Sequence, residues 1–529
     1  MIYDTIIVGA GSAGCVLAYR LSADPNRRVL LLEAGPSDWH PFIHMPAGIA
    51  KLVNRKGINW DYYTEPEAQL GNRRLWWPRG RVLGGSSSIN AMCYIRGDAR
   101  DYDEWAQLVG DERWSWQHVL PVFRRAEANV RGADAWHGAD GLLSVADLRY
   151  RNPLSDTAID AAVACGYPRN ADFNGTRQQG FGFYQVTQKN GARCSTAAGY
   201  LGAARGRANL TVRTRAVAQH VLLDGHRAVG VDYRHHGRLT RAEAGEVILC
   251  GGTINSPQLL LLSGIGPADH LRDIGIRVAH ELPGVGTNLQ DHLDICTLQR
   301  ATQPVTYDQL SDTLVALRYY LRRAGPGTSN VAEAGGFVRT PLAKDERCDM
   351  QFHFVPAQLD DHGRHRLPGY GYTLHACGLR PRSRGTIRLR SANPVDKAAI
   401  CPQYLTDAEG HDLKTLVEGV KLSREILAAS PFDAVRGQEI FPGVGAVADA
   451  DLTAFIRRKA ETIYHPVGSC RMGNDAQAVV DSELRVRGVA GLRVVDASVM
   501  PCLPGGNTNA PTIMIAERAA DLIAGAQAA

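Results

Sequence analysis

A glycine-rich turn near the N-terminus limits what this chain can fold into more than any other feature. Gly9, Gly11 and Gly14 follow a short apolar run, and the last of them lies within a stretch with helical spacing, residues 12–22. Glycines at these positions allow a tight turn, close approach of backbone to a phosphate, and close packing of a helix on a strand. The pattern predicts a βαβ unit, completed by a strand over residues 28–33.

An acidic residue follows the turn at the spacing of a dinucleotide site. Glu33 lies 33 − 14 = 19 residues beyond the last glycine, at the end of the second expected strand. A carboxylate there accepts hydrogen bonds from ribose hydroxyls, and no arginine follows it to hold a 2′-phosphate. A bare GxGxxG motif also occurs in ordinary tight turns, but strand, helix and acid together favour a dinucleotide. The motif does not distinguish NAD from FAD.

A second small-residue segment, GRVLGGSSSIN over residues 80–90, favours the longer cofactor. Its backbone amides can approach a second part of FAD because few side chains stand in the way. The alternative is a serine-rich surface turn.

Length and composition restrict the class of protein. A chain of 529 residues predicts two or more domains. With 44% hydrophobic and 21% charged residues it is typical of a soluble globular protein. A net charge of +5 gives no strong attraction to nucleic acid and leaves weak attraction to an anionic membrane surface.

Cysteine usage and hydropathy indicate the compartment. The 11 cysteines are never spaced as CxxC, which favours neither a disulfide framework nor a zinc site, so we expect a reducing cytoplasm. The N-terminal apolar run is interrupted by Asp4 and has no basic residue before it, so no signal peptide is expected. No apolar stretch is long enough to predict a membrane-spanning helix.

The segment Tyr464-His465-Pro466 supplies a candidate base. Proline biases the preceding histidine to an extended backbone and so restricts where its ring points. An alcohol hydroxyl, with a pKa on the order of 16 like that of water, keeps its proton at pH 7, whereas a neutral imidazole of pKa ~6.5 can accept it. The alternative is a core histidine bonded to backbone.

Asn509 is the candidate partner of His465, with an amide that can hold the substrate oxygen. Its alternative is a helix cap, since Asn, Ala and Pro open the C-terminal helix, and the two interpretations are compatible. A helix start aimed at the flavin pyrimidine ring would stabilise the anionic reduced flavin.

Other groupings are weaker. Acidic residues and histidines gather at 360–365 and at 291–294, but neither group has a known ligand spacing, so we expect polar loops and no metal. Residues 86–88 lack the GxSxG elbow of a hydrolase. Cys470 and Cys502 are expected to be buried thiols.

Four blocks in this order resemble the glucose-methanol-choline (GMC) oxidoreductase family: VGAGSAG with LLEAG, GRVLGGSSSINAMCYIRG, GTINSPQLLLLSGIG, and YHPVGSCRMG followed by LRVVDASVMPCLPGGNTNAPTIMIAERAADLI. The resemblance runs nearly end to end. It implies an α/β fold (α+β overall), with a Rossmann-like FAD-binding domain and an interwoven substrate-binding domain built on an antiparallel sheet with helices. The expected segments are 1–150, 190–302 and 455–529 for the first domain, and 151–189 and 303–454 for the second.

The resemblance implies that His465 is the catalytic base and Asn509 the second member of a His/Asn pair. Some relatives bind flavin covalently through a histidine just before the Asn90 position; Ile89 stands there, so noncovalent FAD is expected. Together, the motif and the resemblance predict these cofactor-binding residues: Gly9, Gly11, Ser12, Ala13, Gly14, Glu33, Ala34, Arg81, Gly84, Gly85, Ser86, Asn90, Ala91, Met92, Val217, Tyr464, Asp496, Ala497 and Thr512.

Within the family, the sequence is similar to those of bacterial choline dehydrogenase-like alcohol dehydrogenases of alkane degradation. This implies primary aliphatic or aromatic alcohols as substrates, hydride transfer to flavin N5, a quinone or other electron acceptor, and peripheral contact with the inner face of the cytoplasmic membrane. Open alternatives are choline, held by the aromatic segment 60–63, an oxygen-using alcohol oxidase, and an FAD-containing hydroxynitrile lyase. The oligomeric state is not predicted.

Overall fold

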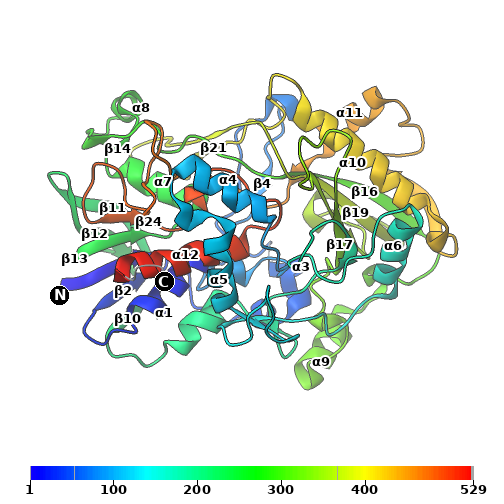
Figure 1. Ribbon diagram of the computed structural model, residues 1–529, viewed down its shortest axis with the longest axis horizontal. Helices are drawn as coiled ribbons and strands as arrows, with labels where there is room; N and C mark the ends of the chain where they lie inside the picture. Colours follow the sequence, from blue (N-terminus) through cyan, green and yellow to red (C-terminus); the bar gives the residue numbers. More distant parts are fainter. Residues whose placement is uncertain (1, 53, 366, 526–529) are drawn as a thin grey trace.

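The computed structural model describes residues 2–52, 54–365 and 367–525. Two sheets dominate it, one toward each end of the long axis, with helices packed around and between them (Figure 1). The mixed α/β architecture confirms the expected fold class.

The first sheet has the strand order β10-β2-β1-β13-β12-β11, with β24 paired to β13. Its parallel strands are β1 (Ile2–Val8), β2 (Val29–Leu32), β10 (Leu210–Arg213), β13 (Arg238–Leu249) and β24 (Leu492–Val494). All four residues of β2 are buried, as expected for a parallel strand covered on both faces. The sheet continues into an antiparallel meander of β11 (Ala216–Asp224), β12 (Arg227–His235) and β13.

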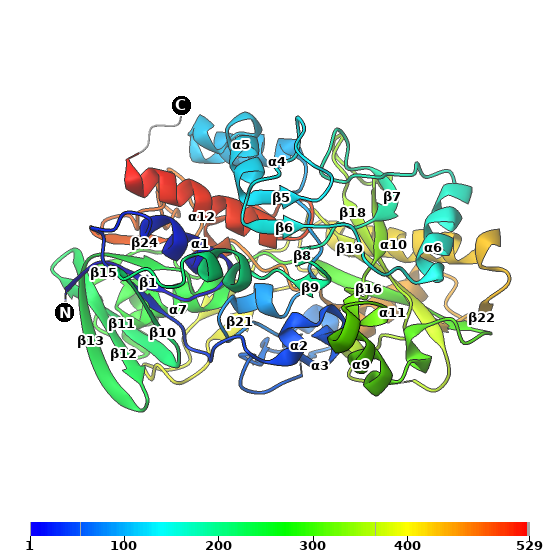
Figure 2. The ribbon, with the colours of Figure 1, turned by 90° about the horizontal axis from the view of Figure 1, so that it is seen from below.

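Two helices from opposite ends of the sequence cover one face of this sheet. Helix α1 (Ser12–Leu21) follows the glycine turn, and α12 (Asn509–Ala524) packs directly against it. Figure 2 shows both on the same side of the strands. Helix α7 (Gly252–Leu262) follows β13. The N-terminal ends of these helices are thereby brought to one region, although their positions in the sequence are far apart.

The second sheet is antiparallel, in the order β22-β16-β19-β18-β17-β7, with β23 on β16. Its strands are β7 (Gly180–Phe183), β16 (Leu293–Ala301), β17 (Ala334–Val338), β18 (Met350–Val355), β19 (Gly371–Gly378), β22 (Arg436–Phe441) and β23 (Glu461–Thr462). The expected domain segments assigned β16 and β23 to the first domain, but both strands pair within this sheet.

Strand alternation gives the second sheet two different faces. On β18, Met350, Phe352 and Phe354 enter an apolar core that includes residues of α10 (His411–Ala428) and α6 (Pro153–Ala164). His353 and Val355, at alternate positions, line a cavity on the other face. The sheet therefore presents a wall of mixed chemistry to the interior of the protein.

The remaining elements surround this frame. The other α-helices are α2 (Pro41–His44), α3 (Ile49–Leu52), α4 (Ala99–Val109), α5 (Trp116–Ala126), α8 (Ala268–Asp273), α9 (Asp312–Arg322) and α11 (Asp449–Lys459). The other strands form two-stranded ribbons: β3 (Tyr62–Tyr63) with β4 (Trp76–Trp77), β5 (Glu127–Asn129) with β6 (Leu143–Val145), β8 (Gln188–Lys189) with β9 (Ala192–Arg193), β14 (Ile265–Gly266) with β15 (His280–Glu281), and β20 (Thr386–Arg388) with β21 (Ala399–Cys401). Among the helices of the described residues, none has both the length and the apolar character needed to cross a membrane.

Candidate active site

A cavity of about 1140 Å³ lies between the two sheets and is lined from both. Val8 and Leu249 contribute from the first sheet, and Asp294 and His353 from the second. Pockets for single small ligands measure about 300–1,000 Å³, so this volume can hold a long cofactor together with a substrate.

The glycine turn forms a cradle at one end of the cavity. Gly9 has a φ of 102°, and a Cβ on it would lie 2.4 Å from the Cys250 carbonyl oxygen. A Cβ on Gly85 would lie 2.7 Å from the Gly11 Cα. The two glycine segments therefore touch, and bare backbone faces the cavity at the start of α1. This fits the phosphate groups of FAD, since amides and the helix terminus attract anions.

Glu33 lies on the cavity wall beside this cradle. It is 5% exposed, and its two carboxylate oxygens accept hydrogen bonds from the Ala10 amide at 2.9 Å and the Gly35 amide at 2.8 Å. Burial raises the pKa of Glu33 to about 7, against the opposing effects of these two amides and the Arg81 charge. Each oxygen keeps a lone pair, so the carboxylate can still accept from ribose hydroxyls.

Most of the expected cofactor-binding residues line this cavity. They are Gly9, Gly11, Ser12, Ala13, Glu33, Ala34, Gly85, Ser86, Asn90, Ala91, Met92, Val217, Tyr464, Asp496, Ala497 and Thr512.

Three expected residues lie outside the cavity lining. A Cβ on Gly14 would lie 1.8 Å from the Gly9 carbonyl oxygen, so Gly14 serves the packing of helix on strand. The amide of Gly84 donates to the Ala10 carbonyl at 2.7 Å. The Arg81 guanidinium stacks over the Trp60 ring, 5.0 Å from its centroid. These three residues contact the residues around the cavity but do not line it themselves.

The expected base, His465, is buried and lines the same cavity. Its backbone N–H donates to Asp291 Oδ1 at 2.8 Å. Tyr464, just before it, has a φ of 73°, and its carbonyl accepts a hydrogen bond from Arg79 Nη2 at 2.8 Å. A residue other than glycine is strained in the left-handed region. These two hydrogen bonds therefore stabilise a backbone conformation that the sequence alone does not favour.

A chain of hydrogen bonds determines which nitrogen of His465 is free to accept a proton. His292 Nε2 lies 3.2 Å from the Leu379 carbonyl, which can only accept, so this nitrogen carries the hydrogen. His292 Nδ1 therefore accepts from His465 Nδ1, 3.0 Å away. The Nε2 of His465 is left with a lone pair, which accepts from Asn507 Nδ2 at 3.1 Å.

The asparagine that meets His465 is Asn507 and not the expected Asn509. Asn509 Oδ1 accepts instead from Ser12 Oγ at 2.8 Å, which joins the starts of α12 and α1. Asn509 is the first residue of α12 and Asn507 lies in the loop before it, so their side chains leave the backbone in different directions. Both line the cavity, and the sequence PGGNTNAP by itself does not choose between them.

The surroundings keep His465 neutral. Burial lowers the pKa of His465 well below its ordinary value, and His292, His353 and Arg79 lower it further by charge. Burial also lowers the pKa of His292 to about 3. At neutral pH both rings are therefore uncharged, which leaves the Nε2 lone pair of His465 available.

Asp291 and His292 were expected in a polar loop and not in a metal site. They do lie outside a strand, directly before β16, but they are 4% and 0% exposed. Asp291 accepts hydrogen bonds from the His465 amide and from Thr462 Oγ1, and His292 orients the His465 ring. Only the alternation of acidic and histidine residues marked them in the sequence.

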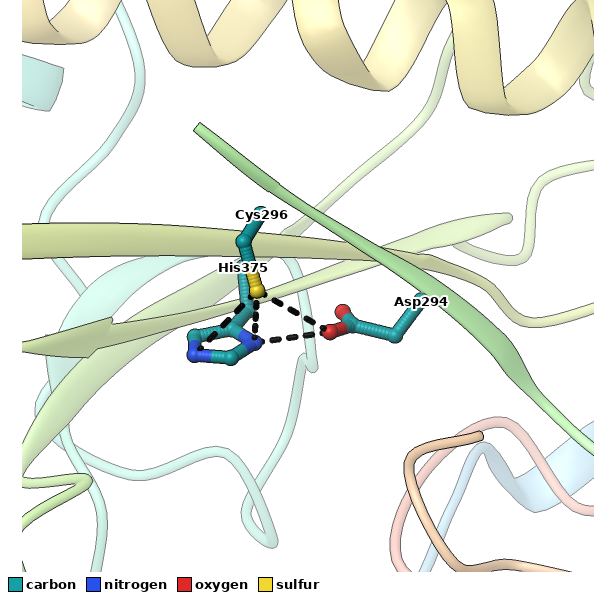
Figure 3. A group of neighbouring side chains, drawn as sticks. All are labelled: Asp294, Cys296 and His375. Carbon is teal, nitrogen blue, oxygen red and sulfur yellow. Dashed lines mark hydrogen bonds and ion pairs between the residues drawn. The ribbon is translucent and has the colours of Figure 1, made fainter. Parts of the chain in front are cut away.

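A second polar group, Asp294, Cys296 and His375, lies on the wall formed by the second sheet (Figure 3). Cys296 and His375 are cross-strand partners on β16 and β19, and Asp294 is two residues away on the same face. His375 Nδ1 lies 2.7 Å from Asp294 Oδ2 and 3.0 Å from Cys296 Sγ. The other carboxylate oxygen, Asp294 Oδ1, is buried without a hydrogen-bond partner among the described residues. The absence of a resident metal stays a prediction.

The fold and the site together define a flavin-dependent oxidoreductase. Family models described as GMC oxidoreductase match residues 3–294 and 381–516. The chain belongs to the GMC oxidoreductase family, and this membership implies FAD.

Individual relatives agree over nearly the whole chain. The chain is 52% identical to the alcohol dehydrogenase (acceptor) of Pseudomonas putida, over 98% of this chain and 95% of that one. It is 46% identical to the mitochondrial choline dehydrogenase of Mus musculus, over 99% and 89%. Among solved structures, pyridoxine 4-oxidase from Mesorbium loti aligns with a TM-score of 0.91 and 33% identity, over 99% of this chain and 100% of that one.

Proposed function

We propose that the protein oxidises primary alcohols, aliphatic or aromatic, to aldehydes and passes the electrons to a quinone. The observation that carries this proposal is the His465 Nε2 lone pair, fixed by His292 and paired with Asn507, in a cavity that also contains the glycine cradle. The similarity to an alcohol dehydrogenase (acceptor) supports the choice of substrate and of an acceptor.

Both glycine segments would hold FAD. Gly9, Gly11 and Glu33 would bind the phosphates and the ribose of the adenine half, and the segment from Gly85 to Met92 would follow the flavin half. When bound, FAD supplies a hydride acceptor at flavin N5. The start of α12 lines the cavity, and its partial positive charge favours a flavin that gains negative charge.

The residues of the chain move the proton. His465 Nε2 takes the proton of the substrate hydroxyl, so that the oxygen gains negative charge as the carbon gives up its hydride. Because His465 Nε2 has one lone pair, the substrate hydroxyl would replace the Asn507 amide as its donor, and Asn507 Nδ2 would then donate to the substrate oxygen. The aldehyde forms when both the proton and the hydride have left the alcohol.

The chemistry of the cavity wall supports an apolar alcohol over choline. Trp60 has the aromatic face that a quaternary ammonium would use, but its ring already packs against Tyr62 and the Arg81 guanidinium. Asp61 does not line the cavity, and its Oδ1 accepts from Trp76 Nε1 at 2.7 Å. Apolar side chains line other parts of the cavity: Leu310, Val315, Val355, Leu359 and Phe441.

We propose that FAD is bound noncovalently. Ile89 lines the cavity at the position where covalent attachment would need a histidine, and its hydrocarbon side chain cannot form that bond. Acid precipitation should release all the flavin into the supernatant. Flavin that stays with the protein pellet would contradict this.

Reduction of the bound flavin tests the reaction. A medium-chain alcohol, mixed anaerobically with the holoenzyme, should bleach the yellow flavin, and choline should not. Cyanide release without bleaching would show a lyase instead. Efficient peroxide formation without added acceptor would show an oxidase.

The compartment belongs to the same proposal. The eleven cysteines are all free, which supports a reducing cytoplasm. We place the enzyme at the inner face of the membrane, in peripheral contact, where a quinone is accessible.

A further inference from the structure

Helix α9 carries an apolar face that points away from the protein. Leu314, Leu317 and Leu321 are 67%, 54% and 72% exposed, and Tyr320 is 44% exposed. Spacings of three, four and seven residues place these side chains along one side of a helix. Tyr319, on the opposite side, is fully buried and anchors the helix to the protein. Figure 1 shows α9 projecting from the edge of the molecule.

The charges beside this apolar face are basic. Arg318 lies four residues after Leu314, about one helical turn further on, and Arg322 directly follows Leu321. Both arginines are exposed. The acidic residue of the helix, Asp312, forms an ion pair with Lys51 Nζ at 2.8 Å, so it does not offset the arginines. An apolar helical face bordered by arginines is typical of a segment that lies in the surface of an anionic bilayer.

Helix α9 also borders the opening of the active-site cavity. Asp312, Val315 and Ala316 line that cavity. The side chains of Asp312 and Lys51, both on the cavity lining, are 70% and 41% exposed, so the cavity reaches the surface beside the helix. Tyr319 Oη donates to the His44 carbonyl at 2.7 Å, which fixes α9 to α2. Both views place α9 close to α3 (Figure 2).

We propose that the apolar face of α9, namely Leu314, Leu317, Tyr320 and Leu321, inserts into the headgroup region of an anionic phospholipid bilayer. This inference rests on the proposed function, because a membrane at this face brings lipid-soluble alcohols and a quinone to the cavity opening. Arg318 and Arg322 pair with lipid phosphates while their stems lie along the apolar boundary. The surface is therefore a docking site that supplies both substrates from the same phase.

Vesicle binding by the holoenzyme tests the proposal. The probes are vesicles of phosphatidylglycerol with phosphatidylethanolamine, and vesicles of phosphatidylcholine alone. The wild-type protein should sediment with the anionic vesicles and much less with the neutral ones. The double variant Leu317→Asn/Leu321→Asn should bind the anionic vesicles at least tenfold more weakly. Arg318→Gln/Arg322→Gln should lose the preference for anionic lipid and most of the salt dependence.

The control is a double variant with equally exposed leucines elsewhere, Leu108→Asn/Leu239→Asn, which are 48% and 61% exposed on α4 and β13. It should bind vesicles as the wild type does. Flavin content of each variant shows that it has folded.

Two activity measurements separate this proposal from the proposed function. With a soluble alcohol and a water-soluble dye as acceptor, Leu317→Asn/Leu321→Asn should turn over like the wild type. With a quinone held in vesicles, its turnover should fall at least tenfold. Equal vesicle binding by the wild type and the variant would overturn the docking site. A dimeric wild-type protein that the two substitutions convert to a monomer would also overturn it, because the apolar face would then be a contact between two copies of the chain. Failure of alcohol oxidation with the soluble dye would contradict the proposed function instead.

Discussion

At the scale of single residues, the position of one histidine nitrogen determines the chemistry. The sequence marked His465, but its Nε2 is available only because His292 accepts the hydrogen on Nδ1. The carbonyl of Leu379 makes His292 an acceptor at that point. Three residues distant in sequence thus set one tautomer, and periodicity or spacing cannot reveal such a relation.

The two asparagines before and at the start of α12 should differ in their effect on catalysis. Asn507→Ala removes the amide that lies 3.1 Å from His465 Nε2, and we expect kcat to fall about 10²–10³-fold, the size found for a lost transition-state donor. Asn509→Ala removes the bond to Ser12 and a cavity-lining amide that does not contact His465, so we expect a smaller loss. Steady-state kinetics with one alcohol decides this, and a larger loss for Asn509→Ala would restore the original expectation.

His292 should act on rate through the orientation of His465. We expect His292→Ala to lower kcat by about 10²–10⁴-fold, the range of a positioned base, while flavin content stays unchanged. The pH profile gives the specific readout: burial is the main cause of the low pKa of His465, and the space left by the His292 ring admits solvent, so the pKa of the base should rise. An unchanged profile with reduced stability would indicate a purely structural role.

At the scale of elements, the two glycine segments depend on one another. A methyl group on Gly85 would lie 2.7 Å from the Gly11 Cα, and the φ of 53° at Gly85 disfavours a side chain as well. The sequence predicted each loop, and the parallel sheet brings them together. The helical stretch after Gly11 was predictable because burial repeats with the period of the element.

Gly85→Ala should weaken FAD binding at least tenfold. The added methyl group pushes the two loops apart where they approach the cofactor. Gly445→Ala, with nothing within 4 Å of the new methyl group, is the control and should bind FAD normally. Flavin titration of the apoprotein measures both, and equal affinities would show that the loops move apart without cost.

At the scale of the whole molecule, the cavity is held by two sheets that contribute to it from opposite sides. Added FAD should therefore stabilise both parts of the protein together. At a free concentration 100 times Kd, a ligand that binds only the folded state adds about 2.7 kcal/mol to the free energy of unfolding. Thermal unfolding of the apoprotein with increasing FAD should show one transition moving upward; two transitions, of which only one moves, would contradict this.

The two buried histidines should lower the stability of the apoprotein as pH falls below 6.5, whereas Glu33, whose pKa is raised to about 7, acts in the opposite direction. The pKa values of His465 and His292 are lowered on folding, for His292 to about 3, so the unfolded chain binds protons that the folded chain does not. The contribution of these two groups to stability therefore falls as pH falls from 6.5 toward the folded pKa values, and does not change above 6.5. Urea midpoints of wild type and His292→Asn between pH 4 and pH 8 isolate the contribution of His292, because Glu33 is the same in both: the wild type should lose stability relative to the variant as pH falls.

By itself, the sequence determined the βαβ unit with its dinucleotide turn and the acidic residue 33 − 14 = 19 positions later, because each is a local pattern with a fixed geometric meaning. The two-domain fold and the role of His465 as base came from the resemblance of sequence blocks to the family. Only the tertiary structure decided that Asn507 and not Asn509 meets His465, that His292 sets its tautomer, and that β16 and β23 belong to the second sheet. These depend on contacts between segments distant in sequence, and a side chain's direction at such a contact is set by the packing of both partners.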